Sequence, residues 1–122
     1  MQRSVFFNLT QIQMPVGALT SITHRVTGVL LALGIPFGIY VLALSLESSQ
    51  SYAQLVRVCD TWMFKVVAIV FIWALAHHLL AGTRHLLMDV DVGSLLPAAR
   101  RSAWMVNLGG VAVALLAAGA VL

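Results

Sequence analysis

Charged residues and cysteine are both scarce in this 122-residue chain. Only 9% of its residues are charged, whereas 61% are hydrophobic, and the mean hydropathy is +0.97. Soluble domains carry about a quarter charged residues, so this composition excludes the soluble class and indicates a membrane protein. Cys59 is the single cysteine, which excludes a disulfide framework or an iron–sulfur site built from this chain alone.

Three long apolar segments fill most of the sequence, at about 22–46, 62–87 and 102–122. Each is close to the roughly 20 residues that cross a hydrocarbon core as a helix. The alternating short strands of a membrane barrel are missing. We therefore expect an all-α membrane protein with three transmembrane helices in a single membrane-anchor domain, 1–122.

Basic residues are divided unevenly between the two ends of these segments. One end carries Arg57 and Lys65, and the other carries five arginines: Arg3, Arg25, Arg84, Arg100 and Arg101. The richer side is cytoplasmic by the positive-inside rule, so we expect a cytoplasmic N-terminus and a C-terminus on the opposite side. No basic patch is interleaved with aromatic residues, and we expect no nucleic-acid partner. Residues 47–61 are polar and predict a solvated connector with a short helical turn.

The segment 77–89, HHLLAGTRHLLMD, places three histidines, an arginine and an aspartate in a membrane-length apolar helix. Ionisable side chains at membrane depth are costly and mark functional sites. At about 100° per residue, one helix face carries His78, Gly82, His85 and Asp89, and a neighbouring face carries His77 and Arg84.

A second polar face opens the first apolar segment, in PVGALTSITHRVTG (15–28). Its members are Ser21, His24, Arg25 and Gly28. Such a face can hydrogen-bond a carbonyl or a carboxylate. Two simpler interpretations compete with this one. His24 and Arg25 could extend to lipid headgroups, and Ser21 could bond to its own helix backbone.

The two polar faces are expected to meet, because the first helix runs outward and the second returns inward. His78 then lies about 10 Å deeper than His85, at 1.5 Å rise per residue. A neutral imidazole is a good iron ligand. We expect His78 to ligate a haem iron, with the propionates directed toward His24, Arg25, Arg84 and His85. His85 projects from the same side of the same helix as His78, and His24 is expected to lie too shallow to reach the iron. A bis-histidine haem would therefore need a histidine from another chain.

Other interpretations of the histidine segment stay open. His77 is the competing ligand, and His78 could instead form a hydrogen bond to another helix. We prefer His78 as ligand because it lies near Ala74, Ala81 and Gly82, which lack the bulk that would exclude a flat ring. Asp89 is a candidate proton relay, with a salt bridge to Arg84 as the alternative.

Two motifs, SITHRVTG (21–28) and HLLAGTRHLLMD (78–89), closely resemble the S-x-x-H-R-x-T/S and H-x-x-x-G-x-R-H-x-x-x-D signatures of the cytochrome b556 subunit family of succinate dehydrogenase. The resemblance covers the whole chain. It implies haem b ligation by His78, with His24, Arg25 and His85 near the propionates, and a ubiquinone site contacted by Ser21 and Arg25. The chain departs from the family at Ser4, where proline is frequent, and at Asp91, where a small residue is common.

The resemblance also implies partners and a location. A second membrane anchor subunit would complete a hetero-oligomeric helical bundle that holds haem b and a quinone pocket in the bacterial inner membrane. A flavoprotein subunit would oxidise succinate, an iron–sulfur subunit would carry the electrons, and ubiquinone would be reduced at this bundle. Arg25 would polarise a quinone oxygen and Ser21 would donate a hydrogen bond. Two alternatives remain: a fumarate reductase anchor that uses menaquinone, and a structural anchor without haem.

Overall fold

The computed structural model describes residues 15–122, so Arg3 and Ser4 lie outside the described residues. Four helices follow one another: α1 (Val16–Glu47), α2 (Ser49–Cys59), α3 (Trp62–Asp89) and α4 (Leu96–Val121). The helices α1, α3 and α4 are long and apolar enough to cross a membrane. The prediction of an all-α protein with three transmembrane helices is confirmed.

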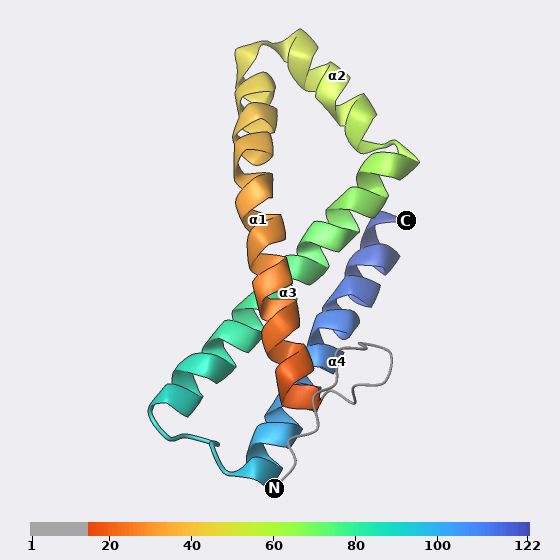
Figure 1. Cartoon of the computed structure of the whole chain (residues 1–122). Coiled ribbons are helices and arrows are strands. Elements are labelled where there is room, and N and C mark those ends of the chain that lie inside the picture. The colour runs from red at the N-terminus through yellow and green to blue at the C-terminus, as the bar shows by residue number, and fades with distance from the viewer. Residues whose placement is uncertain (1–14) are drawn as a thin grey trace, which may run out of the picture.

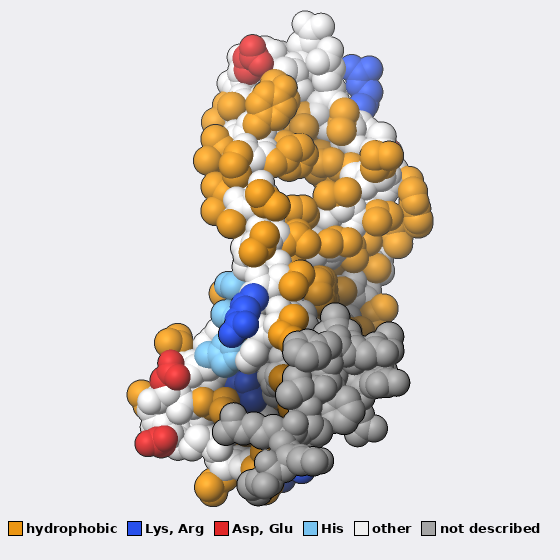
Figure 2. Space-filling view, in the orientation of Figure 1, with side chains coloured by type: hydrophobic (Ala, Val, Ile, Leu, Met, Phe, Trp, Pro, Cys, Tyr) orange, Lys and Arg blue, Asp and Glu red, His pale blue; other side chains and the backbone are white. Residues whose placement is uncertain are grey.

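The long helix α3 crosses α1 and lies beside α4 (Figure 1). From the crossing, α1 and α3 diverge toward the end where α2 joins them. Residues 16–28, 77–89 and 96–110 make up the polar half of the molecule, and residues 29–76 and 111–121 the apolar half. Figure 2 shows histidine and basic side chains gathered on the polar half, whereas hydrophobic side chains cover most of the apolar half.

The connector expected at 47–61 is more ordered than the sequence predicted, because it contains the 11-residue helix α2. A capping box starts this helix: Ser51 N donates to Ser48 Oγ at 3.0 Å, and Ser48 N donates to Ser51 Oγ at 3.2 Å. Leu55 and Val58 of α2 line a small cavity together with side chains of α1 and with Phe64 of α3. The helix α2 therefore bridges the diverging ends of α1 and α3.

An ion pair ties the end of α2 to the start of α3. Lys65 Nζ lies 2.8 Å from Asp60 Oδ1, and it is the one salt bridge found within residues 15–122. The hydrogen bond from Lys65, and then its positive charge, lower the pKa of the Asp60 carboxyl below its ordinary value. Asp60 is exposed, so this pair contributes little to stability.

Small residues bring α3 and α4 close together. The buried stripe of α3 consists of Ala74, His77, Ala81 and Arg84, and that of α4 of Ala103, Val106 and Gly110. A Cβ added at Gly110 would lie 3.3 Å from His77 Cβ, so this contact leaves little room for a side chain. The expectation that Ala74 and Ala81 leave space for a flat ring is wrong, since both are 0% exposed within the helix packing.

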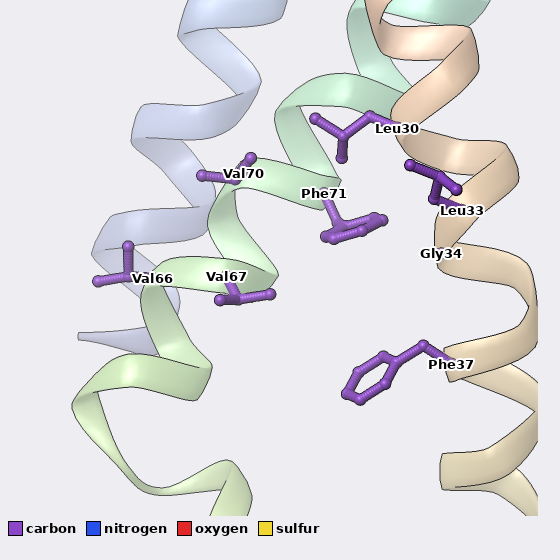
Figure 3. A pocket seen from close by; sticks show the side chains of 8 residues that line it. All are labelled: Leu30, Leu33, Gly34, Phe37, Val66, Val67, Val70 and Phe71. Atoms are coloured by element: carbon purple, nitrogen blue, oxygen red, sulfur yellow. The ribbon is translucent and has the colours of Figure 1, made fainter.

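A groove of about 470 Å³ lies in the apolar half, between α1 and α3 (Figure 3). Its lining is entirely hydrophobic apart from a glycine: Leu30, Leu33, Gly34, Phe37, Val66, Val67, Val70 and Phe71. A Cβ added at Gly34 would overlap the Phe71 ring, so this glycine marks a close approach of the two helices. The groove has no polar side chain that could take part in proton or electron transfer.

The turn between α3 and α4 accounts for the departure from the family pattern at Asp91. This residue has φ +62°, in the left-handed region that favours glycine. Asp91 N donates to Met88 O at 3.0 Å, and Val92 N donates to Leu87 O at 2.8 Å. These bonds satisfy the last carbonyls of α3. Aspartate is one of the few side chains that tolerate this conformation, so the helix ends normally without the small residue.

Candidate functional site: a histidine cluster between α1 and α3

Three of the four histidines of the chain form one cluster in the polar half. The rings of His24 and His78 are stacked, with centroids 4.2 Å apart and planes 12° apart. The ring of His85 meets His24 edge-on, with centroids 5.0 Å apart. The two polar faces inferred from the sequence therefore do lie against each other. Within residues 15–122, no group of three acidic, cysteine or histidine side chains converges as a site for a bare metal ion.

His78 is held on one side by α1. Its Nδ1 lies 3.1 Å from the carbonyl oxygen of His24 and 3.2 Å from Thr27 Oγ1, and the Thr27 hydroxyl donates to the same carbonyl at 2.9 Å. A Cβ added at Gly28 would lie 3.0 Å from His78 Cε1, so a larger residue would crowd the imidazole ring. The helix-to-helix hydrogen bond considered for His78 exists, and it uses Nδ1.

The other ring nitrogen of His78 is left available. His78 Nε2 has no hydrogen-bond partner within residues 15–122 and is not buried. When Nδ1–H donates to a carbonyl, Nε2 carries the lone pair that a metal requires. The local structure thus defines the tautomer of His78 and leaves the lone pair of its Nε2 free of a partner within residues 15–122.

Ser21 contacts the cluster from α1. Its Oγ lies 3.1 Å from His85 Nε2, and this is its one hydrogen bond within residues 15–122. The neighbouring hydroxyls behave differently: Thr20 donates to Val16 O at 2.9 Å and Thr23 to Leu19 O at 2.8 Å. The alternative that Ser21 bonds to its own helix backbone is therefore wrong.

His77 faces away from the cluster, toward α4. Its Nε2 lies 3.0 Å from Asn107 Oδ1, which also accepts a hydrogen bond of 3.2 Å from Thr20. His77 is 2% exposed, and its Nδ1 is buried with no partner within residues 15–122. Its orientation makes it unsuited to ligate a group that His78 contacts. The role of Asn107 was missed, although a lone asparagine in the last apolar segment was the available signal.

Arg84 also turns to α4, which corrects the expected propionate clamp. Its Nε donates to Ser102 Oγ at 2.9 Å, its Nη2 donates to Ala99 O at 3.2 Å, and the residue is 7% exposed. The physical reason is the 100° step between neighbouring residues, which separates Arg84 from His85. The alternative salt bridge with Asp89 is not present. Asp89 ends α3 as an exposed residue.

Arg25 lies on the surface of α1 beside the cluster. It is exposed, has no hydrogen bond within residues 15–122, and borders an apolar groove of about 400 Å³. The rest of this groove is lined by Val26, Val29, Leu30 and Leu33. A guanidinium at the edge of an apolar surface can bind the polar end of an amphiphilic molecule.

Sequence comparisons with known proteins assign the chain to a family. A sequence profile of the succinate dehydrogenase/fumarate reductase transmembrane subunit matches residues 1–118. The chain belongs to this family. Three similar proteins, each named succinate dehydrogenase cytochrome b556 subunit, support the assignment. The protein from Paracoccus denitrificans is 33% identical over 109 residues, which cover 89% of this chain and 84% of the relative. The Coxiella burnetii protein is 34% identical over 107 residues (86% and 85%), and the Rickettsia typhi protein 30% over 109 residues (89% and 85%).

The resemblance inferred from the two motifs is confirmed. As a succinate dehydrogenase/fumarate reductase transmembrane subunit, the chain is a multi-pass membrane anchor of a succinate:quinone oxidoreductase complex. Most signature positions meet in the histidine cluster, namely Ser21, His24, Thr27, His78, Gly82 and His85. Three signature positions do not: Arg84 is directed to α4, and Arg25 and Asp89 are exposed outside the cluster.

Proposed function

We propose that this chain is the haem b-binding anchor of a succinate dehydrogenase and that it contributes to ubiquinone reduction. The geometry of His78 carries the proposal. A backbone carbonyl holds Nδ1, and Nε2 has no partner within residues 15–122. This pattern sets the tautomer of iron-ligating histidines and increases their basicity. The relatives named cytochrome b556 subunit support haem b as the group.

The donor set around His78 fits one face of a haem. His78 would hold the haem iron, and His24, Arg25 and His85 would hold the propionates. Bound haem would supply a one-electron redox centre whose potential depends on these neighbours. A second membrane anchor subunit would supply the other iron ligand. His24 is stacked on His78, His77 faces α4, and His85 lies seven residues along the same helix.

The quinone contact uses the polar face of α1. Ser21 and Arg25 lie one helical turn apart, and the groove beside Arg25 offers hydrophobic contacts to a quinone tail. Arg25 polarises a quinone oxygen and stabilises the negative charge that develops on it, and Ser21 donates a hydrogen bond. Electrons arrive from succinate through the flavoprotein and iron–sulfur subunits. Asp89, exposed at the end of α3, exchanges protons with water.

The polar half faces the cytoplasm in this proposal. Among the described residues, Arg25, Arg84, Arg100 and Arg101 lie at that end, whereas Arg57 and Lys65 lie near the other end. Under the positive-inside rule, the N-terminus is cytoplasmic and the C-terminus periplasmic in a bacterial inner membrane. The iron–sulfur subunit then docks beside Ser21 and Arg25.

The test compares two adjacent histidines in the assembled complex. His78→Ala should remove or strongly perturb the reduced-minus-oxidised haem b spectrum, because it removes the axial nitrogen. His77→Ala should leave the band in place, because that ring is bonded to Asn107. An unaltered low-spin spectrum in His78→Ala would refute the ligand assignment. Absence of haem from the wild-type complex would favour a structural anchor, and menaquinone extracted with the complex would favour a fumarate reductase anchor.

A further inference from the structure

We propose that His85 is the proton donor behind Ser21, so that a proton passes from His85 Nε2 through Ser21 Oγ to a bound quinone oxygen. The inference rests on the proposed function, in which Ser21 contacts the quinone. It assigns to His85 a relay role distinct from that of a propionate neighbour. The carrying observation is the 3.1 Å contact between Ser21 Oγ and His85 Nε2.

Ser21 differs from every other serine and threonine of α1. Four hydroxyls of this helix donate to backbone carbonyls of their own helix three or four residues earlier, namely those of Thr20, Thr23, Thr27 and Ser45. Ser21 has no such bond, and its partner is the imidazole of His85 on α3. Its single proton is therefore not committed to the helix backbone.

The single proton of a hydroxyl dictates the direction of the contact. If Ser21 O–H donated to His85 Nε2, it could not also donate to a quinone oxygen. If His85 Nε2–H donates to Ser21 Oγ, the serine accepts that bond and its own proton is free for the quinone. A quinone-bonded Ser21 therefore requires a proton on His85 Nε2.

The proton balance of the step is simple. Reduction of one quinone to the quinol takes two electrons, which the iron–sulfur subunit delivers, and two protons. In the relay, the Ser21 O–H bond breaks as a quinone O–H bond forms, and the His85 Nε2–H bond breaks as the Ser21 O–H bond re-forms. His85 changes from imidazolium to neutral imidazole and then takes a proton from water. The second quinol proton comes from water.

The surroundings of His85 connect it to the membrane boundary. On α1, the titratable neighbour in contact is His24, and Arg25 is exposed. On α3, Asp89 lies one turn farther along the same face and is exposed. On α4, Arg100 and Arg101 are exposed, and Arg84 is bonded to the start of that helix. Asp89 can therefore collect protons from water and return them to His85.

The experiment uses His85→Gln in the assembled complex. Glutamine can still donate an N–H to Ser21 but cannot titrate, so quinone binding is kept while the proton source is lost. Quinone reduction should show a kcat lowered by about 100-fold, within the range for a positioned proton donor, with KM little changed. The wild-type rate should decline toward high pH, because the relay requires a proton on His85 Nε2. That decline should be missing from His85→Gln.

Controls separate this inference from the proposed function. Thr23→Ala removes a hydroxyl that is bonded to its own helix and should leave quinone reduction unchanged. Activity with an artificial acceptor reports an assembled dehydrogenase in each variant. If Ser21→Ala is impaired but His85→Gln keeps the wild-type kcat and pH profile, the relay is overturned while the quinone contact stands. Normal quinone reduction in Ser21→Ala overturns the quinone contact itself.

The Ser21→Ala variant tests the relay even if the His85→Gln complex fails to assemble. Ser21→Ala disconnects His85 from the quinone, so its residual quinone reduction should also lack the decline toward high pH. Its KM should rise, because a direct contact is lost, whereas KM in His85→Gln should not. Retention of the wild-type pH profile in an assembled Ser21→Ala complex overturns the relay.

Discussion

Different forces hold the helices together in the polar half and in the apolar half of this subunit. In the polar half, hydrogen bonds join three helices, through Thr20, His77 and Asn107 and through Arg84 and Ser102. In the apolar half, α1 and α3 are separated by a groove of about 470 Å³ and approach each other closely at Gly34 and Phe71. The hydrogen bonds between helices are thus concentrated in the polar half, where the orientation of the histidine rings matters.

The contrast has a physical basis in the membrane environment. Lipid tails are as apolar as leucine, so apolar packing gives helices little preference for one rotation over another. A hydrogen bond between buried polar atoms does impose such a preference, because an unpaired polar group in hydrocarbon is costly. The polar half therefore defines the rotation of α3, on which the direction of His78 depends.

The largest expected effect comes from matched arginine substitutions in the two halves. Arg25→Leu should lower quinone reduction by about 100-fold or more, because it removes a charged donor from the developing negative charge. Arg57→Leu, on α2, should leave this activity unchanged. The measurement is quinone reduction beside artificial-acceptor activity. Arg25→Lys should be partly active, since lysine keeps the charge and loses the planar fork. Normal quinone turnover in Arg25→Leu would contradict the quinone contact.

A glycine-to-alanine pair tests whether close helix contact aims His78. Gly28→Ala places a Cβ 3.0 Å from His78 Cε1, and the ring is also held at Nδ1, so the haem b band should shift or be lost. Gly34→Ala is the control in the apolar half, where the Phe71 ring can turn into the groove. The control should keep its spectrum. Equal spectral effects of both substitutions would show that His78 is not specially dependent on Gly28.

Asn107→Leu tests the hydrogen bonds that join the three helices. The change leaves His77 Nε2 without its partner and removes the contact of Thr20 with α4, although Thr20 keeps Val16 O as an acceptor. It should cost about 1–2 kcal/mol of stability. Unfolding of the detergent-solubilised complex measures this loss. Thr20→Val removes one of the two bonds and should cost less. A stability equal to that of the wild type would mean that these bonds do not hold the helices.

The smallest effect is expected at the ion pair between α2 and α3. The folded protein lowers the pKa of Asp60, so the pair stabilises the fold above the ordinary pKa of aspartate, and this contribution is lost as pH falls through the lowered value. Asp60→Asn should therefore reduce stability slightly at neutral pH and not at strongly acidic pH. Because Asp60 is exposed, added salt should remove the difference. A large, salt-independent loss would contradict this weak role.

Local sequence patterns were enough to predict the family and to predict which residues lie on the same face of a helix. The spacing of His78, Gly82 and His85 follows from helical periodicity, and the structure does place all three against α1. The depth expected for His24 was wrong, because its ring is stacked on that of the deeper His78. The helix α2 was underestimated, because its capping box of two serines lacks the usual glutamate and its segment is short. Arg84 was misplaced, because a sequence shows that two faces differ but not which neighbour each one meets.

The sequence by itself determined three membrane-length helices, the uneven distribution of arginines and the two motifs, because each depends on composition or on spacing along one helix. Only the tertiary structure decided that His77 bonds to Asn107, that Arg84 bonds to the start of α4, and that Ser21 bonds to His85. These contacts join residues 18 to 64 positions apart in the chain. They depend on how α1, α3 and α4 cross and rotate against one another, which helical periodicity within a single segment does not specify.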